Sequence, residues 1–175
     1  TEIPVLGLWR QIPPDNHGFG RQRGGASVEW AYALWGSQLF AFMVTSTGAR
    51  FPVTGGMFGG YGGACTPLTV VRPDGGIEAL REWLAQGAPG LEYDAAKMVA
   101  TKPIAGTYEV TNPARPAAPI PEGEIWIQRI GGGGGYGDPL EREPESVMTD
   151  LRQGLISPEV ARDVYRVAWD AATLV

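Results

Sequence analysis

Residues that could perform chemistry are sparse in this chain, and the most suggestive of them lie in a run of glycines. Residues 132–137 read Gly-Gly-Gly-Gly-Tyr-Gly after a predicted strand, which formally satisfies the G-x-G-x-x-G pattern of dinucleotide-binding loops. In such loops a helix begins at the third glycine and binds the pyrophosphate at its amino end. Here Asp138 and Pro139 follow instead, so we reject a nucleotide site. Because no Lys-Ser/Thr pair follows either glycine run, we also reject a Walker loop.

Nucleophilic, acid–base and metal chemistry also lack complete residue sets. The single His17 and the single Cys65 lie in different Gly-rich segments, so neither a Ser-His-Asp nor a Cys-His set can be built. A conventional zinc site and an internal disulfide lack partners for the same reason. Glu141 and Glu143 precede a predicted helix, and we interpret them as a solvated helix entry that the helix dipole favours. The sequence therefore predicts no catalytic residue, no metal and no cofactor bound by this chain alone.

Composition restricts the class of protein further. The 175 residues carry a net charge of -5 without a cluster of Lys and Arg, so we expect no nucleic-acid partner. The first 20 residues hold no apolar signal-peptide core, and no run long enough to cross a bilayer exists, so we expect a cytoplasmic protein without a membrane partner. The 26 Gly and 15 Pro favour short strands joined by turns over a helical bundle.

Strand patterns dominate the first part of the chain. In residues 28–34, Val28, Trp30, Tyr32 and Leu34 share one face of an extended segment. The Gly36-Ser37 pair that follows predicts a two-residue connection to a second strand at residues 39–44, and hence an antiparallel hairpin. The second strand is apolar on both faces, which predicts that one face meets the core and the other meets another sheet or another polypeptide. Further strands are expected at residues 68–72, 107–111 and 124–130, and helices at residues 77–87 and 92–100.

The carboxyl-terminal part is the clearest helical region. One helix is expected from Pro144 to Gly154, and a second, capped by Ser157, carries the apolar stripe Val160, Val164, Val167 and Ala171. We therefore predict an α+β fold, in which an antiparallel β module with Gly-rich loops is followed by a helical hairpin. The β module spans residues 1–138, with a helical insertion near 77–100 and a Pro-rich extended connection at 112–121, and the hairpin tail spans residues 139–175.

Three motifs resemble the hydantoinase B/oxoprolinase family and occur in the order of that family. Residues 131–145 and 150–165, which include Gly-Gly-Gly-Gly-Gly-Tyr-Gly-Asp-Pro and Asp-Leu-Arg-Gln-Gly-Leu-Ile-Ser-Pro-Glu, closely resemble its carboxyl-terminal end. Residues 14–25 are similar to its Pro-Asp-Ser-Gly-Gly-x-Gly-x-x-Arg-Gly-Gly stretch, with His17 where a small residue is usual. Residues 50–60 are similar to its Arg-Phe-Pro-Pro-x-Gly-x-x-Gly-Gly loop.

This resemblance implies a partial polypeptide and a multi-subunit setting. The chain resembles the last third or so of a hydantoinase B subunit, as a split gene product, a companion subunit or a processed piece. It implies a hetero-oligomer with hydantoinase A-like and hydantoinase B-like subunits, in which ATP and a divalent metal are expected in the partner subunits. We expect a small subunit, noncatalytic alone, of an ATP-dependent, biotin-independent ketone carboxylase similar to acetone or acetophenone carboxylase. A hydantoinase/oxoprolinase-type cyclic amide hydrolase is the alternative, and a freestanding small-ligand binding module is the second alternative.

The candidate site is an interface or active-site-proximal loop around the second glycine run. A flexible linker would mix Gly with Ser, whereas consecutive glycines let another chain or a ligand approach the backbone closely. Tyr136 offers a rigid contact, and the Asp138 carboxylate can accept backbone N–H groups. A tight turn without any partner is the alternative. The predicted residues are Gly131, Gly132, Gly133, Gly134, Gly135, Tyr136, Gly137 and Asp138, with Arg50, Phe51 and Pro52.

Overall fold

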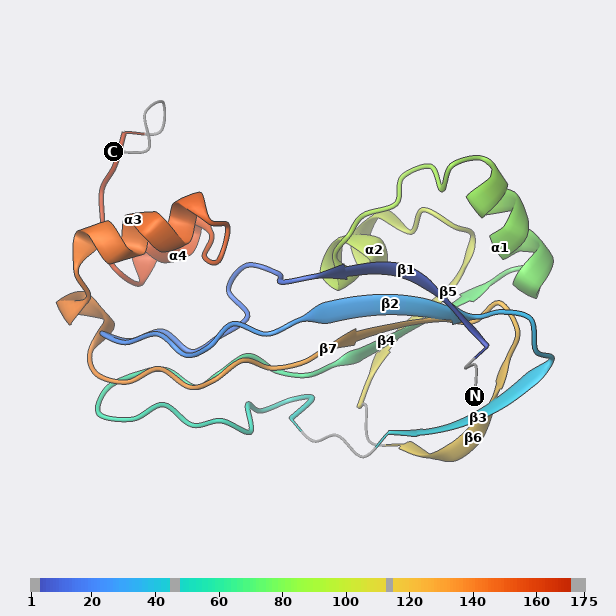
Figure 1. The fold of residues 1–175 in the computed structure, drawn as a ribbon, viewed down its shortest axis with the longest axis horizontal. Helices are drawn as coiled ribbons and strands as arrows, with labels where there is room; N and C mark the ends of the chain where they lie inside the picture. Colours follow the sequence, from blue (N-terminus) through green and yellow to red (C-terminus); the bar gives the residue numbers. More distant parts are fainter. Residues whose placement is uncertain (1–3, 45–47, 113–114, 171–175) are drawn as a thin grey trace. The chain divides into compact units, whose positions relative to one another are not determined.

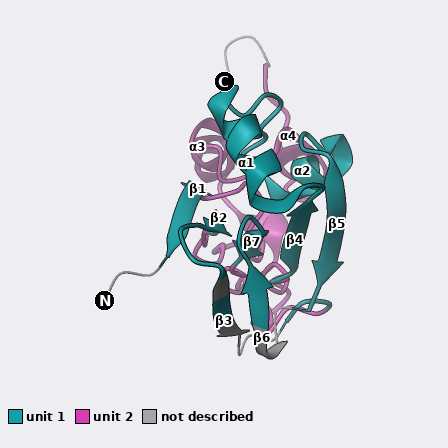
Figure 2. Ribbon diagram, turned by 90° about the vertical axis from the view of Figure 1, so that its right-hand side faces the viewer, with its two compact units in different colours: residues 1–11, 29–50, 66–129 teal, residues 12–28, 51–65, 130–175 magenta. Residues whose placement is uncertain are grey.

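The computed structural model describes residues 4–44, 48–112 and 115–170, which form two compact units (Figures 1 and 2). The first unit consists of residues 1–11, 29–50 and 66–129, and the second of residues 12–28, 51–65 and 130–175. Each unit is thus assembled from segments that are far apart in the sequence. This division differs from the predicted boundary at residue 138, because the second unit combines the carboxyl-terminal helices with two earlier Gly-rich segments.

A five-stranded antiparallel sheet forms the centre of the first unit. Its strand order is β1-β2-β7-β4-β5, so the pairs β1-β2 and β4-β5 are consecutive in the chain, whereas β7 joins them from a distant part of the sequence. A second sheet pairs β3 with β6. The bounds are β1 Val5–Gln11, β2 Glu29–Leu34, β3 Leu39–Val44, β4 Leu68–Pro73, β5 Gly106–Thr111, β6 Arg115–Pro121 and β7 Ile125–Arg129.

Helices cover one face of the five-stranded sheet, and the β3–β6 pair lies on the other (Figure 1). Helix α1 (Gly76–Ala85) buries Leu80 and Trp83, and α2 (Ala95–Thr101) buries Met98, against apolar side chains of β2, β4 and β7. On the opposite face, Ile120 of β6 packs with Trp126 of β7. Both faces of the sheet are therefore covered, which explains why successive residues of β4 and β7 are buried.

A buried ion pair fixes α2 against the sheet. Glu29 of β2 is fully buried, and its carboxylate accepts hydrogen bonds from the Ala95 N–H (3.0 Å) and from the Arg129 Nε (2.8 Å). Arg129 also pairs with Asp94, whose carboxylate caps α2 by accepting the Lys97 N–H. A carboxylate buried in this way is stable only because all these donors converge on it. Glu29 shares a face of β2 with Ala31 and Ala33, and this face packs against the helices, which the sequence alternation alone did not reveal.

The α+β fold with carboxyl-terminal helices is confirmed, but the predicted hairpin is wrong. Strand β2 pairs with β1 and β7, whereas β3 leaves the main sheet and pairs with β6. Gly36 has a positive φ of 78°, which suits a turn. Its N–H donates to the Glu122 carboxylate (2.7 Å), and the chain passes here from the five-stranded sheet to the β3–β6 sheet. The segment 112–121, interpreted as a Pro-rich connection, forms strand β6 from Arg115 onward, and β1 was not predicted.

The second unit contains the short 3-10 helix η1 (Pro139–Glu141) and helices α3 (Pro144–Arg152) and α4 (Pro158–Asp163). The Ser157 hydroxyl accepts the Val160 N–H as the predicted cap of α4. Gly154 follows α3 with φ of 69°, as a helix-ending glycine does. Helix α4 is shorter than its predicted stripe: it ends at Asp163, and Ala171 lies outside the described residues. Within the described ranges, no helix is long and apolar enough to cross a membrane.

Candidate functional site

Three Gly-rich segments of the second unit lie side by side and bond to one another through their backbones (Figure 1). We call residues 12–28, 51–65 and 130–138 the Gly-rich layer. The Gly18 N–H donates to the Gly133 carbonyl (2.8 Å), the Tyr61 N–H to the Phe19 carbonyl (2.7 Å) and the Gly135 N–H to the Tyr61 carbonyl (2.9 Å). Amides of the glycine run are thus engaged by carbonyls of this chain, and the run is followed by η1 rather than by a long helix. This geometry differs from that of a phosphate-binding loop.

Close packing of backbones explains why these positions are glycine. A Cβ on Gly134 would collide with the Gly55 carbonyl oxygen, and one on Gly135 with the Phe19 carbonyl oxygen. In the same way, a Cβ on Gly60 would meet the Gly135 carbonyl. The close backbone approach expected from the sequence is therefore present, and the neighbours observed are the chain's own segments. That a partner chain or ligand also reaches this segment stays a prediction.

The Gly-rich layer carries large apolar side chains that are exposed. Phe51 is 80% exposed and Phe58 75%, and the rings of Phe58 and Tyr136 have centroids 5.1 Å apart. Met57 forms a β-bridge with Tyr136, which places these side chains on adjoining segments. The exposed apolar side chains of the layer are Phe51, Val53, Met57, Phe58, Tyr61 and Tyr136.

The remaining predicted site residues fall in different places. The Asp138 carboxylate accepts the Leu140 N–H (2.9 Å) and so caps η1, as its predicted turn-fixing role requires. Phe51 and Pro52 are exposed in the second unit. Arg50 belongs to the first unit, where it lines a cavity of about 470 Å³ together with Val110 and others. The Arg50-Phe51-Pro52 motif thus spans the boundary between the two units.

A buried charge cluster, which the sequence did not reveal, lies beneath the layer. The Asp150 carboxylate of α3 pairs with Arg23 (3.0 Å) and with Arg142 (2.7 Å). His17 is only 2% exposed, and neither ring nitrogen has a hydrogen-bond partner among the described residues. Burial, and then the charge of Arg23, lower the pKa of His17. The imidazole is therefore held neutral beside a paired carboxylate.

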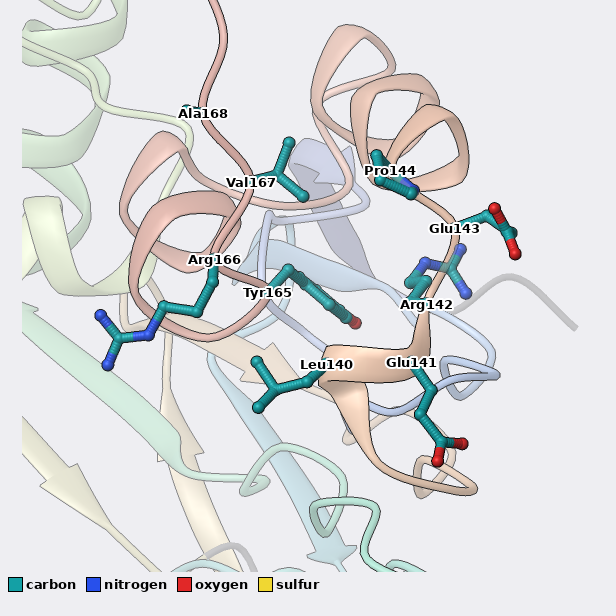
Figure 3. A pocket seen from close by; sticks show the side chains of 9 residues that line it. All are labelled: Leu140, Glu141, Arg142, Glu143, Pro144, Tyr165, Arg166, Val167 and Ala168. Carbon is teal, nitrogen blue, oxygen red and sulfur yellow. The ribbon is translucent and has the colours of Figure 1, made fainter.

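A cavity of about 530 Å³ opens where η1 meets the residues after α4 (Figure 3). The Arg142 guanidinium lies 5.9 Å from the centre of the Tyr165 ring, and burial raises the pKa of Tyr165. Glu141 and Glu143 also line the cavity, so its charge is mixed. No nucleophile–base pair is formed by these side chains. Among the residues that the structure describes, no group of three or more His, Cys, Asp and Glu is arranged to hold a metal ion.

The hydantoinase B/oxoprolinase family model matches residues 1–139, most of the chain. The chain belongs to this family. It is 29% identical over 177 residues to the acetophenone carboxylase delta subunit of Aromatoleum aromaticum, covering 98% of this chain and 25% of that subunit. It is 26% identical to the acetone carboxylase alpha subunit of Xanthobacter autotrophicus, covering 94% of this chain and 21% of that subunit. The chain thus spans about a quarter of the length of these relatives.

Two solved structures have the same fold over nearly the whole chain. A nucleotide-free acetone carboxylase superposes with a TM-score of 0.73 at 23% identity, covering 94% of this chain and 22% of that one. The ATP-dependent caprolactamase of Pseudomonas jessenii superposes with a TM-score of 0.63 at 21% identity, covering 97% of this chain and 24% of that one. The family identification from three motifs in the sequence is confirmed.

Proposed function

We propose that this chain is part of a multi-subunit, ATP-dependent and biotin-independent ketone carboxylase, and that it has no catalytic activity by itself. The observation that carries the proposal is the match to the acetophenone carboxylase delta subunit, which extends over 98% of the chain. The match to the acetone carboxylase alpha subunit, over 94% of the chain, supports it.

The proposed partners are a hydantoinase A-like subunit and the remaining hydantoinase B-like region. ATP and a divalent metal would be bound there. In the described part of this chain the Gly133, Gly135 and Gly137 amides donate to carbonyls of the chain itself. The proposed role of the segment from Gly131 to Asp138, with Arg50, Phe51 and Pro52, is that of an interface or active-site-proximal loop. The cytoplasm is the expected location, which fractionation of the source cells tests.

The reaction class is tested on the complex purified from its source. Its subunits are identified by mass spectrometry, and ATP consumption is measured with acetone or acetophenone, with and without bicarbonate. We expect ATP consumption to require both the ketone and bicarbonate. ATP consumption that requires only a cyclic amide, with no effect of bicarbonate, would reverse the order of the two candidate reactions.

Hydrolysis of a cyclic amide is the second candidate function. The likeness of fold to the ATP-dependent caprolactamase, over 97% of this chain, favours it. A shorter match, 50% identical over 48 residues, relates the chain to the beta subunit of a caprolactamase. The amide-only arm of the same assay, with caprolactam, hydantoin and 5-oxoproline as substrates, distinguishes this function.

A further inference from the structure

Within the second unit, residues 12–28 contact the helices α3 and α4 largely through polar groups, and we call these contacts the helix junction. The Asp15 N–H donates to the Leu155 carbonyl (2.9 Å), and the Asp15 carboxylate accepts the Ser157 N–H (2.9 Å). Of residues 12–28, Phe19 is the one that packs against the apolar core of these helices in the described part of the chain. The junction therefore depends more on hydrogen bonds and charges than on buried apolar area.

His17 lies in this junction without a hydrogen bond that would stabilise a charge on its ring. It is 2% exposed, and both ring nitrogens lack a hydrogen-bond partner among the described residues. The ring packs edge-on against Phe19, which packs in turn against Tyr165, a phenol that is uncharged at neutral and acid pH. Burial of an ionised group without a hydrogen-bonded partner is strongly unfavourable. The closed junction therefore accommodates His17 in its neutral form.

The charged groups around His17 are already paired with one another. Those that act on the imidazole are Asp15 and Arg23 from its own segment, Asp150 from α3 and Arg142 from the end of η1. One Asp150 oxygen accepts the Arg23 Nε (3.0 Å), and the other accepts the Arg142 guanidinium (2.7 Å). The Asp15 carboxylate is engaged by a backbone N–H. Protonation of the imidazole would place a third cation beside two guanidinium groups and two carboxylates.

Acid favours the open junction over the closed one. In the closed junction burial, and then the charge of Arg23, lower the pKa of His17 below 6.5, whereas an imidazole released into water has a pKa near 6.5. The open form therefore binds a proton in a pH range where the closed form does not. The preference for the closed form is complete above pH 6.5 and weakens as the pH falls toward the lowered pKa.

We propose that His17 makes the helix junction an acid-sensitive latch, so that its protonation separates α3 and α4 from residues 12–28 before the rest of the chain unfolds. Residues 12–28 keep uncharged backbone bonds to the glycine run: the Gly18 N–H donates to the Gly133 carbonyl (2.8 Å), and Gln22 and Tyr136 exchange two bonds of 2.9 Å. The apolar cluster of α3 and α4 is also separate from the cluster between the five-stranded sheet and its helices. Opening at the junction thus leaves these other contacts intact.

Amide hydrogen exchange of the 175-residue chain at pH 7.5 and pH 5 locates the opening. The reporters are the Asp15 and Ser157 N–H groups, which bond across the junction. The controls are amides of β2 and β7, which pair within the five-stranded sheet. After correction for the intrinsic effect of pH on exchange, we expect the protection of the reporters to fall about tenfold at pH 5, since each pH unit below 6.5 contributes up to about tenfold.

The dependence of exchange on urea distinguishes local opening from unfolding of the whole chain. Local opening exposes little surface, so low urea should hardly change the exchange of the reporters at pH 5, whereas it should accelerate exchange of the sheet amides. Reporters that exchange at the same rate as the sheet amides, with the same dependence on urea, would show that acid unfolds the whole chain, and the latch would be wrong.

His17→Gln is the matched variant, because Gln stays neutral while the carboxylates of the junction remain. We expect its reporters to lose most of their dependence on pH. An equal fall of protection in the wild type and in His17→Gln would assign the dependence to the carboxylates and overturn the proposal.

Nuclear magnetic resonance tests the wild type without any substitution. His17 is the single histidine of the chain, so its ring signals are identified directly. We expect the closed form to keep the signals of a neutral imidazole below pH 6.5. An imidazole that is protonated with an apparent pKa of 6.5 or higher, while the reporters stay protected, would also overturn the latch.

Discussion

Gly134 shows why individual positions of the Gly-rich layer require glycine. Its φ is not positive, but a Cβ there would collide with the Gly55 carbonyl oxygen, which is backbone and cannot rotate away. We expect Gly134→Ala to destabilise the chain by about 1–3 kcal/mol, because overpacking forces the backbone to move. Thermal unfolding measures this loss, at about 2–4 °C per kcal/mol for a chain of this size.

Gly25→Ala is the matched control for this prediction. It belongs to the same layer, its φ is not positive, and a Cβ there would have nothing within 4 Å. We expect a change of about 0.5 kcal/mol or less. Equal stability of both variants would show that backbone contact does not select glycine at residue 134.

At the scale of the element, the segment 12–28 is held to α3 by the cluster of Asp150 with Arg23 and Arg142. His17 lies in this segment, with Asp15 as a further charged neighbour, and the ring of Phe19 packs against it at 5.5 Å. The pKa of His17 is lowered from 6.5, so the unfolded chain binds a proton in a pH range where the folded chain does not. Its contribution to stability is therefore complete above pH 6.5 and is lost as the pH falls toward the lowered pKa.

We expect the melting temperature of the wild type to fall more steeply from pH 7.5 to pH 5 than that of His17→Gln. Below pH 6.5 each pH unit removes at most about 1.4 kcal/mol, until the lowered pKa is reached. Carboxylates that titrate in this range contribute to both proteins and cancel in the comparison. Parallel melting curves against pH for the two proteins would contradict a buried neutral imidazole.

At the scale of the whole molecule, both compact units are closed by pairings between segments far apart in the chain. Because the chain corresponds to about a quarter of its relatives, we expect it to show no ATP hydrolysis by itself with ketones or cyclic amides. A coupled phosphate-release assay on the purified chain checks this, with the complex from its source as the positive control. Robust turnover by the chain alone is the contrary result. A lone monomer in native mass measurement from the source would instead favour the freestanding binding module.

Interactions between residues close in the sequence allowed many of the helices and strands to be predicted. Periodicity located β2, β3, β4, β5 and β7, because alternation and β-rich composition act within a few residues. Pro158 after Ser157, and Gly154 after α3, located the helix boundaries, because caps depend on one or two residues. The three Gly-rich motifs identified the family, which the family match confirmed.

Pairing and burial were decided only by the tertiary structure. Gly36 suits a hairpin turn, but β3 pairs with β6, some 80 residues later, because β1 and β7 occupy both edges of β2. The Pro-rich sequence of β6 gave no strand signal, since its extended backbone is stabilised by that distant partner. Likewise, the sequence by itself determined that the glycines allow close approach, whereas only the fold decided that the approaching groups are the Gly55 and Phe19 carbonyls. Contacts between residues so far apart depend on the path of the whole chain, which local sequence patterns do not determine.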